Sequence, residues 1–163
     1  MKNAIEQFHH TVKYVFNVTP VNLTIDSEAV EYNGFQCRVK NKNILYRTSK
    51  ITPKKIGQFL TCWKRNSAGI TEPYTKSDSI DFYVVDCKTK NQHGVFVFPK
   101  PVLVEQGILT TKSNDGKRGF RVYPSWDNPT SKQAIQTQHW QLDFFVEMVD
   151  EDSYRNLRSL LDK

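Results

Sequence analysis

The sequence predicts an α+β protein with a mixed central β-sheet flanked by helices. Apolar residues recur at helical spacing near both ends of the chain, whereas short runs rich in β-branched and aromatic residues fill its middle. The 163 residues include 38% hydrophobic and 12% aromatic ones, with no linker, repeat or low-complexity segment. We therefore expect residues 1–163 to form one domain with a sizeable core.

The first third of the chain is predicted to contain a helix and a β-hairpin. Ile5, Phe8, Val12 and Phe16 follow three- and four-residue steps, which are typical of an amphipathic helix, and Pro20 ends any continuation. After a turn that contains a glycine, we expect strands over residues 35–39 and 44–48, joined by a tight turn at residues 41–43.

The middle of the chain is predicted to form more strands, with one short helical turn among them. A threonine before Pro53 is typical of a helix start, so we expect a single helical turn over residues 53–56. Strand-type residues follow at positions 57–64, and a polar loop is expected over residues 66–79. The second block of strands then begins with a hairpin formed by residues 80–88 and 94–98.

The last third is predicted to be mainly helical. The double-proline segment 99–109 is compatible with a helix, and the Asp-Gly turn at residues 115–116 precedes a strand over 119–123. Ser131 is expected to cap a helix with one face formed by Ala134, Ile135, Gln138, Leu142, Phe145 and Val146. Asp150 or Asp152 caps the final helix, whose inward side carries Tyr154, Leu157, Leu160 and Leu161.

The positive charge of the chain is concentrated in one stretch. The sequence has 23 Lys and Arg against 17 Asp and Glu, for a net charge of +6. Residues 32–71, which we call the basic block, hold nine of these cations and no acid. A long stretch of one sign favours a polyanionic partner, and nucleic acid is the commonest one. The alternative is that acids elsewhere in the fold, such as those of the C-terminal segment, balance these cations.

Several classes of protein are excluded by the sequence. The longest apolar runs are too short to span a bilayer, and the first ten residues lack the apolar stretch of a secretory signal. Cys37, Cys62 and Cys87 are expected to be reduced, buried thiols on neighbouring strands, because no Cys or His spacing predicts a metal site. We therefore expect a cytoplasmic protein with no membrane insertion, no metal site and no cofactor.

The hairpin over residues 80–100 contains the best candidates for catalytic residues. Asp81 is expected across the ladder from Lys100, and Asp86 with Lys88 forms a local acid-x-Lys pattern. Nucleases of the PD-(D/E)xK type hold a metal ion and an activating lysine on such a hairpin. Here Phe98 stands in place of the second carboxylate, and an aromatic ring cannot ligate Mg²⁺. The pattern therefore suggests a restriction-endonuclease-like core that is catalytically degenerate, which favours a protein that is not an enzyme.

Five blocks of sequence carry a resemblance to a known family. They are Gly-Gln-Phe-Leu-Thr-Cys-Trp-Lys-Arg (57–65), Ile-Asp-Phe-Tyr-Val-Val (80–85), Gly-Val-Phe-Val-Phe-Pro-Lys (94–100), Lys-Arg-Gly-Phe-Arg-Val-Tyr-Pro (117–124) and Gln-Thr-Gln-His-Trp-Gln (136–141). Taken in order, from about residue 35 to residue 145, they resemble the MepB family of small bacterial proteins. That family is named for a gene found beside a multidrug efflux pump and has no established enzymatic activity. The resemblance therefore implies a cytosolic bacterial protein, without fixing what it does.

The function that these observations favour is binding of DNA or RNA through the phosphate backbone, without strong sequence preference. The candidate phosphate contacts are Arg38, Lys40, Arg47, Lys64, Arg65, Lys100, Lys117, Arg118 and Arg121. A Mg²⁺-dependent nuclease is one alternative, in which Asp81, Asp86, Lys88 or Lys100 acts with a carboxylate from elsewhere in the chain. The other alternative is an efflux-associated protein that binds a small molecule or a protein in an aromatic pocket. The sequence leaves the oligomeric state open.

Overall fold

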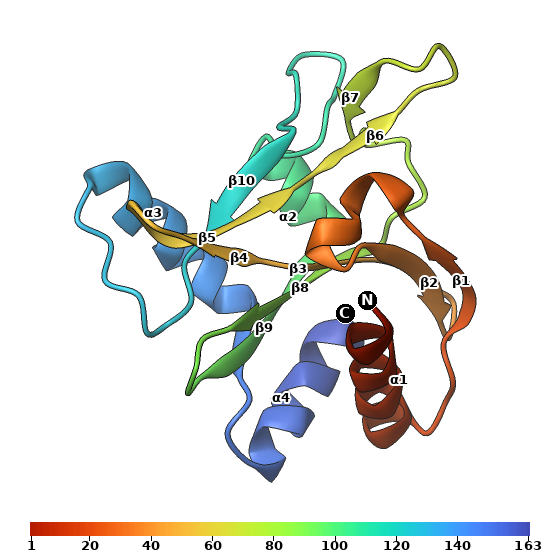
Figure 1. Cartoon of the computed structure of the whole chain (residues 1–163), viewed down its shortest axis with the longest axis vertical. Coiled ribbons are helices and arrows are strands. Elements are labelled where there is room, and N and C mark those ends of the chain that lie inside the picture. Colours follow the sequence, from red (N-terminus) through yellow and green to blue (C-terminus); the bar gives the residue numbers. More distant parts are fainter.

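The computed structural model describes residues 1–163 and has a six-stranded mixed sheet at its centre, which we call the main sheet (Figure 1). Strands β3 and β8 are parallel, and every other neighbouring pair is antiparallel. In spatial order the strands are β1 (Val21–Ile25), β2 (Phe35–Val39), β3 (Lys42–Thr48), β8 (Phe82–Lys88), β9 (His93–Pro99) and β11 (Phe145–Glu147). This architecture confirms the predicted α+β class with a mixed sheet flanked by helices.

Two helices from opposite ends of the chain cover one face of the main sheet. Helices α1 (Lys2–Phe16) and α4 (Glu151–Leu161) lie side by side there (Figure 1). Their apolar side chains bury Phe82 and Val84 of β8. The predicted start of α4 is confirmed, because the Asp150 side chain accepts a hydrogen bond from a backbone amide of the first turn. None of the helices is long and apolar enough to cross a membrane.

The other face of the main sheet is covered by a second layer. This layer contains β4 (Lys50–Thr52), β5 (Lys55–Thr61), β10 (Gly119–Val122), α2 (Lys100–Glu105) and α3 (Lys132–Gln141). Its buried residues pack against alternate residues of β8 and β9, so neighbouring side chains of β8 point to opposite faces of the sheet. This alternation agrees with the predicted strand.

Three segments differ from the predicted secondary structure. The expected helical turn at residues 53–56 is wrong, because Pro53 lies in a tight turn between β4 and β5, where Thr52 pairs with Lys55. The expected strand over residues 57–64 is divided at residue 62 into β5 and β6 (Trp63–Arg65). The expected polar loop contains β7 (Thr71–Pro73), which pairs with β6.

Two further differences lie outside the middle of the chain. The helix predicted to extend to residue 146 ends at Gln141, and after a 3₁₀ turn, η2 (Leu142–Phe144), the chain forms β11. The free edge of β9 supplies backbone partners to β11, and this pairing replaces the helix. Strand β1 and the 3₁₀ helix η1 (Ser27–Tyr32) were not predicted, since the apolar pattern of both segments is weak.

The three cysteines are buried and unpaired, as predicted, but they do not lie on neighbouring strands, because Cys37 is on β2, Cys87 is on β8 and Cys62 lies between β5 and β6. Cys37 lies on the α1–α4 side of the main sheet, whereas Cys62 and Cys87 belong to the core beneath the second layer. Burial raises the pKa of the Cys37 thiol and of the Cys62 thiol to about 12. All three therefore remain protonated thiols near neutral pH, which is the expected behaviour of core cysteines.

Candidate functional site

The basic block does not form a free positive face, because acids from other parts of the chain balance much of it. Lys40 pairs with Asp162 at 3.3 Å, and Lys50 pairs with Glu31 at 3.1 Å. Five of its nine cations form such ion pairs, the others being Arg47, Lys64 and Arg65. The charge balance that the sequence left as an alternative is therefore present for more than half of the block.

The prediction that Arg47 contacts phosphate is wrong, because its side chain is 0% exposed and cannot reach a phosphate. Its guanidinium forms an ion pair with Asp26 and donates a hydrogen bond of 2.9 Å to the carbonyl oxygen of Tyr46. It also approaches the hydroxyl of Tyr74 at 3.5 Å. Arg47 thus fastens β3 to the segment before η1 and contributes to the core rather than to a surface.

Lys64 and Arg65 lie at the surface but are held by acids. The Lys64 ammonium lies 2.6 Å from a carboxylate oxygen of Asp78, and Arg65 donates to Glu28 at 2.7 Å. Burial opposes ionisation of Asp78, but hydrogen bonds from Lys64 and Thr75 outweigh it and hold the pKa of Asp78 below its usual value. These two cations are matched locally and offer little charge to a polyanion.

The hairpin candidates for catalysis lie where the sequence places them, but their polar atoms are engaged in structure. The backbone amide of Lys100 donates to the carbonyl oxygen of Asp81 at 2.9 Å, so these residues are neighbours across the ladder as expected. The Asp81 carboxylate accepts the backbone amide of Asn43 at 2.7 Å, and the Lys100 ammonium donates to the carbonyl oxygen of Asp78. Phe98 is fully buried against Phe96 in the core. No group of three His, Cys, Asp or Glu side chains is placed to hold a metal ion.

Asp86 and Lys88 lie on the opposite face of the main sheet from Tyr83, next to α1. The Asp86 carboxylate contacts Nε2 of His93 at 2.5 Å and the Lys88 ammonium at 3.0 Å. Burial opposes ionisation of Asp86, but the hydrogen bond and charge from His93, with the charge of Lys88, lower its pKa below the usual value. The partner role of His93 was missed, since a histidine at a hairpin turn is ordinarily solvated.

A polar pocket of about 280 Å³ has cations and no acid among its lining residues, and we call it the cationic pocket. A separate acid-free polar pocket is lined by Lys76 and Lys112. The cationic pocket lies along the free edge of β10, next to α3. Its lining residues are Gln106, Ile108, Lys117, Gly119, Phe120, Arg121, Tyr123, Ser131, Gln133, Ala134, Thr137, Trp140 and Gln141. Lys117 and Arg121 are the cationic residues among them, and neither forms an ion pair in the protein.

The walls of the cationic pocket are fixed by hydrogen bonds between β10 and α3. The buried Gln141 side chain donates to the carbonyl oxygen of Arg121 and accepts the backbone amide of Tyr123, each at 2.9 Å. The Ser131 hydroxyl caps α3, while the backbone amides of the first two helical residues, Lys132 and Gln133, have no acceptor in the protein. Unpaired amides at a helix start carry partial positive charge and add to that of the cations.

Arg118 extends this positive region onto the outer side of the second layer. Its guanidinium donates a hydrogen bond of 3.2 Å to the carbonyl oxygen of Thr71, and its side chain lines a shallow groove beside Trp63. The Arg121 guanidinium turns toward β5, where it donates to the carbonyl oxygen of Gly57 at 3.2 Å and lies over the Phe59 ring, so its charge is on the same outer side as Arg118. The sequence pointed to the loop that carries Lys117 and Arg118, but it missed the contribution of α3 because helix and loop meet only in the tertiary fold.

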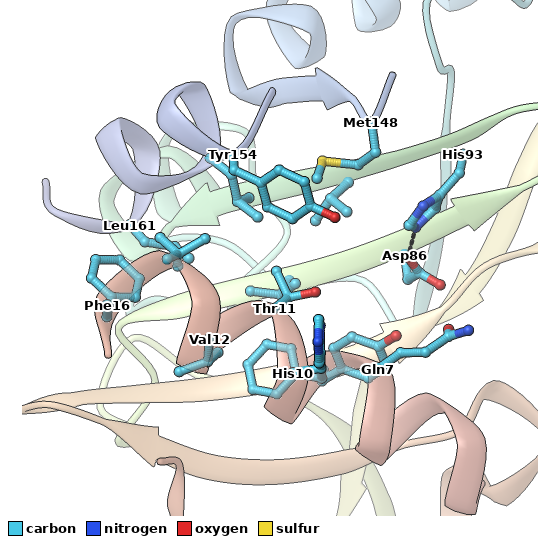
Figure 2. Close-up of a pocket in the computed structure, with 16 residues that line it drawn as sticks. Gln7, His10, Thr11, Val12, Phe16, Asp86, His93, Met148, Tyr154 and Leu161 are labelled. Carbon is cyan, nitrogen blue, oxygen red and sulfur yellow. Dashed lines mark hydrogen bonds and ion pairs between the residues drawn. The ribbon is translucent and has the colours of Figure 1, made fainter. Parts of the chain in front are cut away.

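A second pocket, of about 270 Å³, lies between α1, α4 and the main sheet, and we call it the apolar pocket (Figure 2). Eleven of its sixteen lining residues are hydrophobic. Its polar side chains gather at one end, where Gln7 and His10 of α1 lie near Asp86 and His93 (Figure 2). The two pockets therefore lie on opposite faces of the main sheet and differ in character.

Comparison with known proteins identifies the family. The family described as MepB-like matches residues 26–147, which is more than half of the chain and includes the whole cationic pocket. The chain belongs to the MepB-like family. The crystal structure of MepB is 35% identical and superimposes with a TM-score of 0.79, covering 86% of this chain and 95% of that chain. No curated protein matches the sequence.

A second solved structure, of a bacterial homing endonuclease, has a TM-score of only 0.44. It is 12% identical and covers 88% of this chain and 93% of that chain. A likeness at this level establishes neither a shared activity nor a shared site. Membership of the MepB-like family therefore does not specify what this protein binds or does.

Proposed function

We propose that this protein binds nucleic acid through the phosphate backbone, and that the cationic pocket with the adjoining Arg118 forms the contact surface. The observation that carries the proposal is that this pocket combines cations with the unpaired amides at the start of α3 and has no acid among its lining residues. Elsewhere, most cations of the basic block are matched by acids within 4 Å, so their charge is not available to a partner. Lys117, Arg118 and Arg121 are not matched in this way.

The chemistry of the cationic pocket suits a phosphate group. Arg121 can donate two parallel hydrogen bonds to phosphate oxygens, and Lys117 adds a mobile point charge. The Ser131 hydroxyl adds a donor, and the unpaired amides at the start of α3 favour an anion. Because these groups recognise phosphate rather than base edges, we expect little sequence preference.

The core of this proposed binding protein is nuclease-like and catalytically degenerate in our interpretation. Phe98 pairs with Tyr83 in the hairpin register, where a carboxylate would be needed beside Lys100. The polar atoms of Asp81 and Lys100 are used for hydrogen bonds to the backbone. These contacts support binding without cleavage.

The proposal is tested by fluorescence anisotropy with labelled single-stranded DNA, duplex DNA and RNA. Arg121→Ala and Lys117→Ala are each expected to weaken binding about three- to tenfold, because each removes one charge-assisted phosphate contact. The matched control is Lys13→Ala, which removes the same charge from the exposed side of α1, beyond the main sheet, and should leave affinity unchanged. Wild-type protein that binds none of the three nucleic acids, or an equal loss in the control, would contradict the proposal.

A further inference from the structure

The apolar pocket is independent of the proposed nucleic-acid surface, since it lies on the other face of the main sheet. Val12 of α1 and Leu161 of α4 form its walls, and Val84 and Val95 of the sheet lie beneath it. Figure 2 shows Val12 on α1 and Leu161 on α4 among the residues that line the pocket. A space of about 270 Å³ exceeds the ~150 Å³ apolar cavity that is known to admit benzene.

The polar end of the pocket decides what kind of molecule fits. Asp86 is only 6% exposed, and its carboxylate is neutralised by Lys88 at 3.0 Å and hydrogen-bonded to His93 at 2.5 Å. Lys88 in turn donates to the side-chain oxygen of Gln7 at 2.6 Å, which ties the strand to α1. The charges at this end are therefore already balanced. A charged ligand head would lose its hydration there without meeting an unmatched charge of opposite sign.

Three hydrogen-bonding groups of α1 remain available beside this balanced cluster. The Thr11 hydroxyl, the side-chain amide NH₂ of Gln7 and the His10 imidazole have no hydrogen-bond partner within the protein, and all three residues line the pocket. Figure 2 shows the Thr11 side chain between the apolar walls and the polar end. An uncharged hydroxyl or amide group on a ligand can exchange hydrogen bonds with these side chains.

We propose that the apolar pocket binds a small, uncharged molecule that has an apolar ring or short chain and one hydroxyl or amide head group. The ring or chain lies between α1 and α4, and the head group lies beside Thr11 and Gln7. The apolar walls bury the ring or chain of the ligand, and hydrogen bonds to its head group fix its orientation. Small-molecule sites commonly combine these two kinds of contact.

The head-group preference is tested on the wild-type protein with three probes that share one scaffold: phenylbutanol, phenylbutylamine and phenylbutyrate. Isothermal titration calorimetry should show phenylbutanol binding at least tenfold more tightly than the amine and the carboxylate. Equal or tighter binding of either charged probe would overturn the uncharged head group, and absence of binding by all three would overturn the site.

The location is tested with variants of α1. Thr11→Trp should fill the pocket and lower the affinity for phenylbutanol more than tenfold, whereas Lys13→Trp on the exposed side of the same helix should leave it unchanged. Thr11→Val keeps the shape of the side chain and removes its hydroxyl, so the affinity for phenylbutanol should fall about threefold. This variant tests the site even if Thr11→Trp impairs folding. Unchanged affinity in Thr11→Val and in folded Thr11→Trp would place the ligand elsewhere.

Discussion

Arg47 and Arg121 carry the same charge, but their surroundings give them different roles. Arg47 is fully buried and neutralised by Asp26, whereas Arg121 lines an open pocket without an acid. The sequence placed both among the candidate phosphate contacts, because a one-dimensional charge pattern contains no information about which acid folds against which cation. Only the tertiary structure distinguishes an arginine that stabilises the core from one that can meet a ligand.

Replacement of Arg47 tests its structural role. Arg47→Met should lower the free energy of unfolding by about 3 kcal/mol, since it leaves the partly buried Asp26 carboxylate without its partner. Arg118→Met, at an exposed position, should change the same quantity by less than about 0.5 kcal/mol. Urea denaturation measures both values, and similar small losses in the two variants would show that the buried pair is not needed for stability.

The Asp86 cluster predicts a pH dependence of stability. The pKa of Asp86 is lowered in the folded state, so the cluster contributes stability above the ordinary carboxyl pKa of 3.8. That contribution should be lost as the pH falls below about 4 and through the lower folded pKa. Asp86→Asn should therefore be less stable than the wild type between about pH 5 and 7, and the gap should shrink at lower pH. Urea denaturation at several pH values measures the difference in free energy of unfolding between the two proteins. A difference that does not change with pH would contradict this role for Asp86.

At the scale of elements, pairing with a neighbouring strand can determine whether a segment forms a helix or a strand, where the local sequence pattern does not. The segment after Gln141 has residues that suit a helix, yet it forms β11 because the edge of β9 offers backbone partners. In contrast, α1, β2, β8, β9 and α4 were predicted well, because strong periodicity or clear capping specifies them. The tight turn at Pro53 was mistaken for a helix start because Thr-Pro is compatible with both structures.

Gln141 provides a test of how one helix supports the edge of β10. Gln141→Leu should lower the free energy of unfolding by about 2 kcal/mol, because it leaves the carbonyl oxygen of Arg121 and the amide of Tyr123 without partners. It should also weaken nucleic-acid binding, since the wall of the cationic pocket loses its support. Gln136→Leu, at an exposed position of the same helix, is the control. Stability and affinity that match the control would exclude a supporting role for Gln141.

At the scale of the whole molecule, the main sheet separates two sites of different chemistry. The net charge of +6 arises mainly from the basic block, but ion pairs such as Lys40–Asp162 and Arg65–Glu28 neutralise more than half of the cations in this block. The cations that we propose as the binding surface are instead Lys117, Arg118 and Arg121, none of which forms an ion pair. The sequence predicted the Lys117–Arg121 segment, whereas the pocket itself needed α3, which is distant from this loop in sequence.

Because the two sites lie on opposite faces, we expect them to act independently. Thr11→Trp, which fills the apolar pocket, should leave the affinity for labelled DNA within about twofold of the wild-type value. Anisotropy measurements with the wild type and this variant provide the comparison. A large change in DNA affinity in a folded variant would instead indicate that the two faces of the sheet are coupled.

The salt dependence of nucleic-acid binding tests the central claim most directly. For a labelled single strand, the slope of log K against log salt concentration should be about 0.7 less steep for each phosphate contact that is removed. The double variant Lys117→Ala/Arg121→Ala should therefore reduce the slope by about 1.4. Lys40→Ala/Lys64→Ala removes two cations that are already paired with acids and should leave the slope nearly unchanged. Equal reductions in the two double variants would contradict the claim that the unmatched cations of the cationic pocket form the binding surface.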